Sequence, residues 1–212
     1  MKDAAEVIRR LEREYPDARI ALNYSTPLEL LVAVVLSAQC TDEAVNKITQ
    51  GLFEKYRTAE DYAGADREHL EQDIKSTGFY HSKAKSLIGA AASIVADFGG
   101  EVPRTMAELT SLPGVGRKTA NIVLYNAFGI TDGIAVDTHV KRLSGRIGFT
   151  ANSEPEKIER DLMEQIPRAI WGGFSYLLIE HGRAICIARK PKCGYCMLKD
   201  ICQWELKDRF SG

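Results

Sequence analysis

The chain has 212 residues, enough for one ordinary domain or two small ones with a buried core. Its 45% hydrophobic and 27% charged residues are typical of a globular protein. The formal net charge of −1 excludes a polybasic protein, so a surface that binds nucleic acid needs its positive charge gathered on one face. The longest apolar run, residues 30–36, is too short to cross a bilayer, and the charged residues 1–10 do not fit a secretory signal. We therefore expect a cytoplasmic, intracellular protein with no membrane partner.

The sequence predicts an all-α fold, because apolar residues recur at the helical period and strand signals are weak. No long repeat or linker divides the chain, but its last thirty residues are basic and rich in cysteine, which indicates a second subdomain. In chain order, the expected helices lie around Val7–Leu11, over Pro27–Leu36, after a Thr41 cap, over residues 84–98 before Gly99-Gly100, after Gly116, after Asp137, over residues 156–166 and over residues 174–187.

Four of the five cysteines are crowded near the end of the sequence with the spacing C-x6-C-x2-C-x5-C. A reducing compartment disfavours disulfides, and four thiolates this close can surround one zinc ion or one iron–sulfur cluster. Only the middle pair has the CxxC spacing typical of zinc sites, so the spacing leaves zinc and 4Fe–4S open. The fifth cysteine, Cys40, is expected to be a small buried side chain. The candidate ligands are Cys186, Cys193, Cys196 and Cys202.

The loop between the first two of these cysteines carries three cations, Arg189, Lys190 and Lys192. Three isolated charges would ordinarily belong to a solvated loop. Metal ligands on both sides lower the entropy that the loop loses on binding, so we favour contacts with phosphate.

The stretch LPGVGRKTA, residues 112–120, places a Pro-Gly-x-Gly turn before a helix. Gly114 and Gly116 permit positive φ and let a phosphate approach the backbone at the helix N-terminus. The stretch fits neither a dinucleotide fingerprint, which needs a third glycine after a strand, nor a P-loop. It fits a helix-hairpin-helix that binds one DNA strand without reading its sequence.

Lys118 follows this turn within the first turn of the predicted helix. The helix dipole disfavours a cation there, and burial would disfavour it further, so both favour the neutral amine that attacks carbon. The alternative is an ordinary surface lysine that binds phosphate.

Asp137 precedes another predicted helix, in AVDTHVKRLSGR. It can cap that helix, and the same carboxylate can take a proton or stabilise a developing oxocarbenium charge. His139 and Arg142 are candidate phosphate ligands, although a histidine there is more often simply exposed. Residues 112–149 hold five Lys/Arg against two acids, and residues 181–202 five against one, so positive charge gathers locally despite the low net charge.

Taken together, LPGVGRKTAN, VDTHVKR and the cysteine spacing closely resemble the endonuclease III family of helix-hairpin-helix DNA glycosylases. LSAQCTDEAVNK and GFYHSKA extend the resemblance over nearly the whole chain. It implies a six-helix domain over residues 21–131, a cluster domain of residues 1–20 and 132–212, and a DNA-binding cleft between them. It also implies that the four cysteines bind one 4Fe–4S cluster.

The resemblance implies a bifunctional glycosylase and AP lyase that removes oxidised pyrimidines from duplex DNA. We expect a monomer that is associated with the nucleoid when it acts on DNA with damaged pyrimidines or abasic sites. Lys118 would attack the sugar C1′ with the help of Asp137, and β-elimination would then cut the strand. Gln39 would fill the gap left by the extruded nucleotide, and Phe79 would wedge into the opposite strand.

Several positions depart from the family pattern. Phe79 replaces a more usual aliphatic wedge, Thr77 a larger apolar residue and Cys40 a small alanine, and one extra residue lies between the lysine and aspartate motifs. The alternatives are an adenine-mismatch glycosylase, which lacks the lysine and has a further C-terminal domain, a DNA-binding module without activity, and a zinc-binding regulatory protein.

Overall fold

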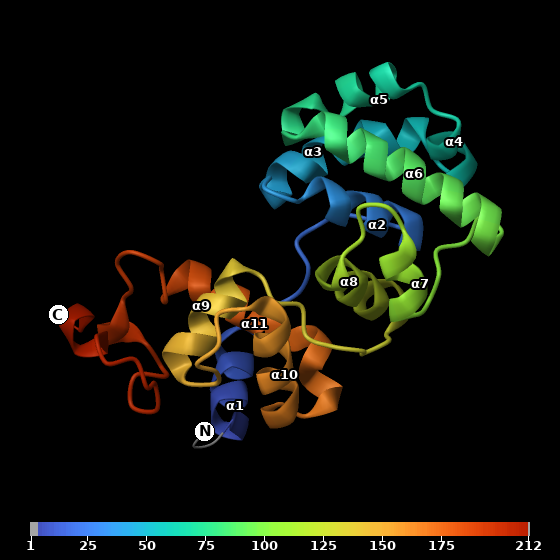
Figure 1. The fold of residues 1–212 in the computed structure, drawn as a ribbon. Helices are drawn as coiled ribbons and strands as arrows, with labels where there is room; N and C mark the ends of the chain where they lie inside the picture. The colour runs from blue at the N-terminus through green and yellow to red at the C-terminus, as the bar shows by residue number, and fades with distance from the viewer. Residues whose placement is uncertain (1–3, 212) are drawn as a thin grey trace. The chain divides into compact units, whose positions relative to one another are not determined.

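The computed structural model describes residues 4–211, which form α-helices and short 3₁₀ helices without a β-strand (Figure 1). The all-α prediction is confirmed. The chain divides into two compact units. We call Ala21–Ile130 the central unit, and Met1–Ile20 together with Thr131–Gly212 the terminal unit. In the part that the structure describes, no helix is long and apolar enough to cross a membrane.

The central unit is built around an apolar helix, α2, whose residues 30–36 are all buried. Helices α6 and α8 contact α2, and threonine or aspartate side chains cap the beginnings of α2, α3, α4, α5 and α7. All residues of this unit are described, and they form seven α-helices where the resemblance implied six. They are α2 (Pro27–Leu36), α3 (Asp42–Lys55), α4 (Ala59–Ala63), α5 (Arg67–Asp73), η1 (Lys75–Thr77), α6 (Tyr80–Phe98), α7 (Met106–Ser111) and α8 (Arg117–Phe128).

Buried Glu71 ties α5 to α6. Its carboxylate accepts a hydrogen bond from Arg67 Nε at 2.8 Å and lies 2.5 Å from His81 Nδ1. Burial acts to raise the pKa of Glu71, but the bonds to Arg67 and His81 outweigh it and lower that pKa. The pair therefore links the segment before Phe79 to the first turn of α6.

The terminal unit packs helices from distant parts of the sequence around one apolar core. Residues of α1, α9, α10 and α11 bury Leu11, Leu143, Leu162 and Phe174 together. Helix α11 begins at Trp171 and ends at Ala184, three residues before the predicted end, because the chain turns toward the cysteine site. The elements are α1 (Ala4–Glu14), α9 (Thr138–Ile147), α10 (Pro155–Gln165), η2 (Arg168–Ile170), α11 (Trp171–Ala184), η3 (Cys193–Tyr195) and η4 (Lys207–Phe210).

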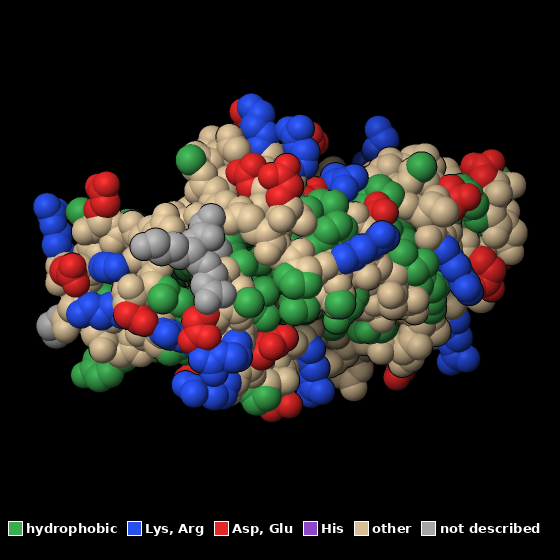
Figure 2. Space-filling model, turned by 90° about the horizontal axis from the view of Figure 1, so that it is seen from below, with side chains coloured by type: hydrophobic (Ala, Val, Ile, Leu, Met, Phe, Trp, Pro, Cys, Tyr) green, Lys and Arg blue, Asp and Glu red, His purple; other side chains and the backbone are tan. Residues whose placement is uncertain are grey.

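The charged side chains are mixed on the surface that Figure 2 shows. On this face Lys and Arg alternate with Asp and Glu, and hydrophobic side chains lie between them. This mixture matches the net charge of −1. The face shown is therefore not a single basic surface of the kind that nucleic-acid binding calls for.

Candidate nucleic-acid interface and cysteine site

Helices α7 and α8 form a hairpin whose turn is the Pro-Gly-x-Gly stretch (Figure 1). Leu112 and Val115 are buried and anchor the turn, and the Val115 N–H donates to the Leu112 carbonyl at 3.1 Å. Gly114 has φ of +78°, as predicted. Gly116 does not use the positive φ that glycine permits; it has an extended backbone with φ of −93° and serves as the N-cap of α8.

Small residues of α6 make room for this turn. A Cβ added at Gly114 would lie 2.5 Å from Ser86 Cβ, and one added at Gly89 would lie 3.3 Å from Pro113. A Cβ added at Gly116 would meet nothing within 4 Å. Gly114 is therefore required by folding, whereas the space beside Gly116 is open to a ligand.

The N-terminus of α8 has no side-chain cap, because Gly116 occupies the cap position. The first N–H groups of an uncapped helix favour an anion. Lys118 is the second residue of α8 and is exposed. Burial therefore does not act on Lys118, because the buried face of α8 is formed by Ala120, Val123 and Leu124.

The two residues expected to enter DNA share an uncommon backbone conformation. Among residues 4–211, Gln39 and Phe79 are the two non-glycine residues with positive φ, at 55° and 50°. Both are exposed, and the Phe79 side chain is 65% accessible. Positive φ costs a bulky residue free energy, which points to a function for these loops rather than to stability. Cys40, next to Gln39, is half-buried rather than buried.

Asp137 caps α9 in the terminal unit, as predicted. Its Oδ1 accepts the Val140 N–H at 2.7 Å, and the side chain is half-buried. The segment before it is fixed because Ile134 is fully buried and Ser175 Oγ donates to the Ala135 carbonyl at 2.7 Å. The carboxylate therefore has a defined position within its unit.

His139 and Arg142 are half-buried between α9 and α11. Arg142 donates to the Cys186 carbonyl at 3.2 Å and to the Gly182 carbonyl at 3.3 Å, and its Nη2 lies 3.2 Å from His139 Nδ1. Burial lowers the pKa of His139, and a Cβ at Gly182 would lie 2.7 Å from its Nδ1. The expectation that such a histidine is simply exposed is wrong. In addition, Arg142 holds the end of α11, a role that the sequence did not indicate.

All four cysteines of the C-terminal cluster line one pocket. Arg146, His181, Lys199, Trp204 and Lys207 also line it. Burial raises the pKa of Cys196 to about 11 and also raises the pKa values of Cys193 and Cys202, and the neighbouring thiolates raise all three further. Four thiols around one space with several cations are a donor set suited to a metal cluster, which would bind the thiolates and release their protons. Among the described residues, no group of three His, Cys, Asp or Glu side chains is arranged to hold a metal ion.

Polar groups contact the cysteine sulfurs. Arg146 Nη1 donates to Cys186 Sγ at 3.3 Å and to the Ile187 carbonyl at 3.1 Å. His181 Nε2 lies 3.4 Å from Cys196 Sγ, and burial lowers the pKa of this histidine to about 4. Such contacts orient the ligands of a metal site.

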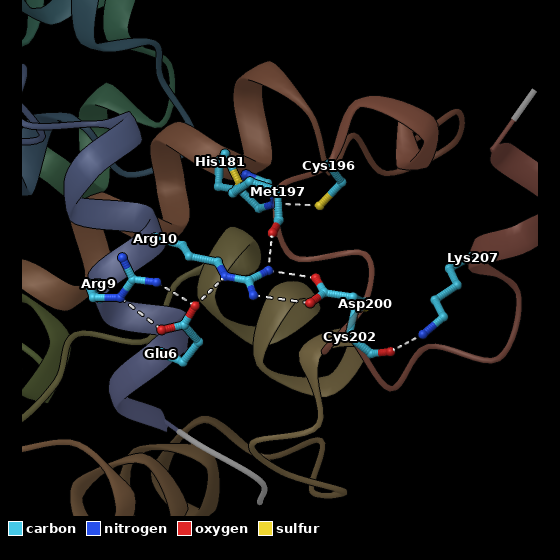
Figure 3. Close-up of polar contacts among 9 residues, drawn as sticks. All are labelled: Glu6, Arg9, Arg10, His181, Cys196, Met197, Asp200, Cys202 and Lys207. Atoms are coloured by element: carbon cyan, nitrogen blue, oxygen red, sulfur yellow. Dashed lines mark hydrogen bonds and ion pairs between the residues drawn. The ribbon is translucent and has the colours of Figure 1, made fainter.

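Helix α1 holds the far end of the cysteine loop, which we define as residues 186–202 (Figure 3). Arg10 donates to the Met197 carbonyl at 2.6 Å and pairs with the Asp200 carboxylate at 2.5 and 3.0 Å. Glu6 accepts from Arg10 Nε at 2.6 Å, and Lys207 Nζ donates to the Cys202 carbonyl. Arg189, Lys190 and Lys192 are exposed on the same loop. The loop is thus fixed at both ends while its cations face solvent.

Comparison with known proteins gives a consistent result. Residues 32–168 match the HhH-GPD superfamily of base excision DNA repair proteins. Endonuclease III of Synechocystis sp. is 55% identical over 199 residues, 94% of this chain and 91% of the relative. Endonuclease III of Escherichia coli K12 is 42% identical over 202 residues, 95% of each chain. This chain belongs to the endonuclease III family.

A solved structure of the family supports the same assignment. A trapped endonuclease III–DNA covalent intermediate, in its estranged-adenine complex, has a TM-score of 0.92 and 45% identity and covers 99% of both chains. The superfamily match spans Lys118 and Asp137 but ends before the cysteine loop. The cysteine site therefore depends on the four thiols themselves and on the full-length relatives in the family.

Proposed function

We propose that this protein is a bifunctional DNA glycosylase and AP lyase of base excision repair that acts on oxidised pyrimidines in duplex DNA inside the cell. Lys118 is the nucleophile. The observation that carries the proposal is an exposed lysine directly after the open Gly116 turn, in a chain of the endonuclease III family. The covalent DNA intermediate trapped in a relative supports a mechanism of this kind.

The reaction begins at the deoxyribose of the damaged nucleotide. Lys118 Nζ bonds to C1′ as the bond from C1′ to the base breaks, and the base leaves with the bonding electrons and then takes up a proton. Opening of the sugar gives an iminium ion, which acidifies the C2′ proton. Loss of that proton to a base forms a C=C bond and expels the 3′ phosphate. Hydrolysis of the imine then releases the enzyme.

Asp137 supplies a carboxylate to this reaction. It takes a proton from Lys118 or stabilises the positive charge that develops on the sugar as the base departs. The N-cap bond to Val140 leaves a second carboxylate oxygen for this role. Capping and catalysis are therefore compatible in one side chain.

The DNA contacts are divided between backbone binding and nucleotide extrusion. Gly114 and Gly116 bind a phosphate at the uncapped start of α8, and Arg189, Lys190 and Lys192 add salt-dependent contacts, while His139 offers a phosphate a hydrogen bond. Extrusion of a stacked nucleotide costs about a few kcal/mol, and least for a damaged base. Gln39 fills the space left in the stack, and Phe79 enters the opposite strand.

The cysteine loop holds a 4Fe–4S cluster through Cys186, Cys193, Cys196 and Cys202. When bound, the cluster would fix the loop, while Arg189, Lys190 and Lys192 of that loop would contact DNA. The common pocket of the four thiols supports this assignment. A brown colour with visible absorbance in the purified protein is expected, whereas a zinc protein would be colourless.

The mechanism is tested by borohydride trapping on duplexes that contain thymine glycol or an abasic site. Wild-type protein should form a covalent adduct, and Lys118→Gln should form none. Lys157→Gln is the matched control, because Lys157 is also an exposed lysine in the first turn of a helix. A Lys118→Gln protein that still traps and cuts DNA would disprove the mechanism.

A further inference from the structure

Lys83 is a buried lysine of α6 whose side chain is held by two backbone carbonyls. It is 6% exposed, and Nζ donates to the carbonyls of Leu36 and Thr77 at 2.8 Å each. Leu36 is the last residue of α2 and Thr77 the last of η1, so both carbonyls lie at helix ends where the helix itself offers no donor. Burial lowers the pKa of Lys83, but even the neutral amine keeps two N–H donors.

Each of these carbonyls immediately precedes one of the two strained loops. Gln39 lies three residues after Leu36, and Phe79 lies two residues after Thr77. Lys83 also contacts the second loop through its own backbone, because its N–H donates to the Phe79 carbonyl at 3.0 Å. One side chain therefore joins two segments about forty residues apart in sequence at the point where each leaves its helix.

We propose that Lys83 is a positioning residue that holds the Gln39 and Phe79 loops at a fixed spacing, so that both enter the duplex together when a nucleotide is extruded. This inference rests on the DNA-inserting roles proposed above for those two residues. Extrusion is favourable only if the inserted side chains replace the lost stacking. Loops that are already ordered lose less entropy when they insert than loops that move independently. Lys83 contacts neither DNA nor the reacting atoms.

The test compares duplex and single-stranded DNA with the same lesion, because single-stranded DNA needs no nucleotide to be extruded from a base pair. Lys83→Met keeps the length of the side chain and removes both hydrogen bonds. We expect its single-turnover excision rate to fall about tenfold or more on the duplex and by less than about twofold on the single strand. Lys83→Arg keeps the donors and should restore most of the duplex rate. Lys85→Met, an exposed lysine on the same helix, should leave the ratio of the two rates unchanged.

Equal losses on both substrates, or no loss on either, would overturn the proposal, since general destabilisation lowers both rates alike. If Lys83→Met does not fold, Lys83→Gln, which keeps a donor for one carbonyl, is measured on the same two substrates. Fluorescence of 2-aminopurine beside the lesion reports extrusion without chemistry and should rise more slowly in the variant. A wild-type protein that forms no borohydride adduct would refute the Lys118 mechanism, and an unchanged fluorescence rise in the Lys83 variant would refute the present inference.

Discussion

Replacing Asp137 by asparagine separates its two roles. The asparagine carbonyl can accept the same Val140 N–H bond, now 2.7 Å long, and asparagine and aspartate are nearly equal as N-caps. Loss of the charge beside the helix N-terminus costs about 0.3–1 kcal/mol. We therefore expect the free energy of unfolding of Asp137→Asn to stay within about 1 kcal/mol of wild type. Asp137→Ala, which also loses the cap bond, should lose roughly a further 1 kcal/mol.

The rate of base release should fall far more than the stability does. Because a charge that stabilises the departing-base transition state is lost, Asp137→Asn should slow single-turnover base release by about 100- to 1000-fold. Binding to undamaged DNA should change little. Urea unfolding and release of thymine glycol from a duplex measure the two quantities, with Asp132→Asn as the control for loss of a nearby acid. An asparagine variant that releases base at the wild-type rate would refute catalysis and leave Asp137 as an N-cap alone.

Four further predictions rest on close contacts and charge. Gly114→Ala combines positive φ with a Cβ 2.5 Å from a serine of α6, so thermal unfolding should show a loss of roughly 2–5 kcal/mol. Gly116→Ala has open space and should change stability by less than about 0.5 kcal/mol while weakening DNA binding in a filter or anisotropy assay. Gly182→Ala would place a Cβ 2.7 Å from His139 Nδ1 and push α9 away from α11. Arg142 of α9 holds the Cys186 carbonyl, so the cysteine loop should be disturbed, and the iron content and visible absorbance per chain should fall. The pKa of Glu71 is lowered in the folded protein, so the stabilisation that its carboxylate gives is present above the unfolded pKa near 4.5 and is lost as pH falls through the folded pKa. Glu71→Gln should therefore make the free energy of unfolding depend less on pH in this acidic range.

Each of these predictions has an outcome that contradicts it. A Gly114→Ala protein as stable as wild type would mean that the turn relaxes away from α6. Unchanged DNA affinity in Gly116→Ala would exclude a phosphate at that turn. Full iron content in Gly182→Ala would show that α9 and α11 can separate without disturbing the cysteine loop. An unaltered pH profile in Glu71→Gln would assign the acid sensitivity to other carboxylates.

The long helices and the gathering of the four cysteines could be predicted from the sequence, because helical periodicity and spaced cysteines are local signals. Helix α2 and the Thr41 cap lie where the pattern predicts. The short helices α4 and α5 were missed, since so few residues show no helical period, whereas α7 was predicted as the first helix of the hairpin. The exposure of Lys118 and the extended backbone of Gly116 depend on which face of α8 packs inward, a tertiary property.

Several residues that hold the site in place show no pattern in the sequence around them. Arg10 contacts Asp200 across 190 positions, and Arg146 contacts Cys186 across 40, so neither role is visible in a window of sequence. Lys83 looks like an ordinary cation in a polar stretch until the fold buries it between two helix ends. Gly182 resembles any helical glycine until α9 approaches it. These residues act through pairings between distant segments, which spacing and composition do not encode.

The pairing of α1 with the cysteine loop has a consequence for synthesis of the chain. The Arg10 contacts cannot form until Asp200 has left the ribosome, and the fourth thiol, Cys202, emerges later still. At about 5–20 residues per second, α1 waits roughly 10–40 s with Val7, Ile8 and Leu11 lacking their partners. The central unit has all its residues by position 130 and can fold during that interval. Maturation therefore has an imposed order, in which binding of the proposed cluster is among the last events and the apolar face of α1 waits for its partners until then.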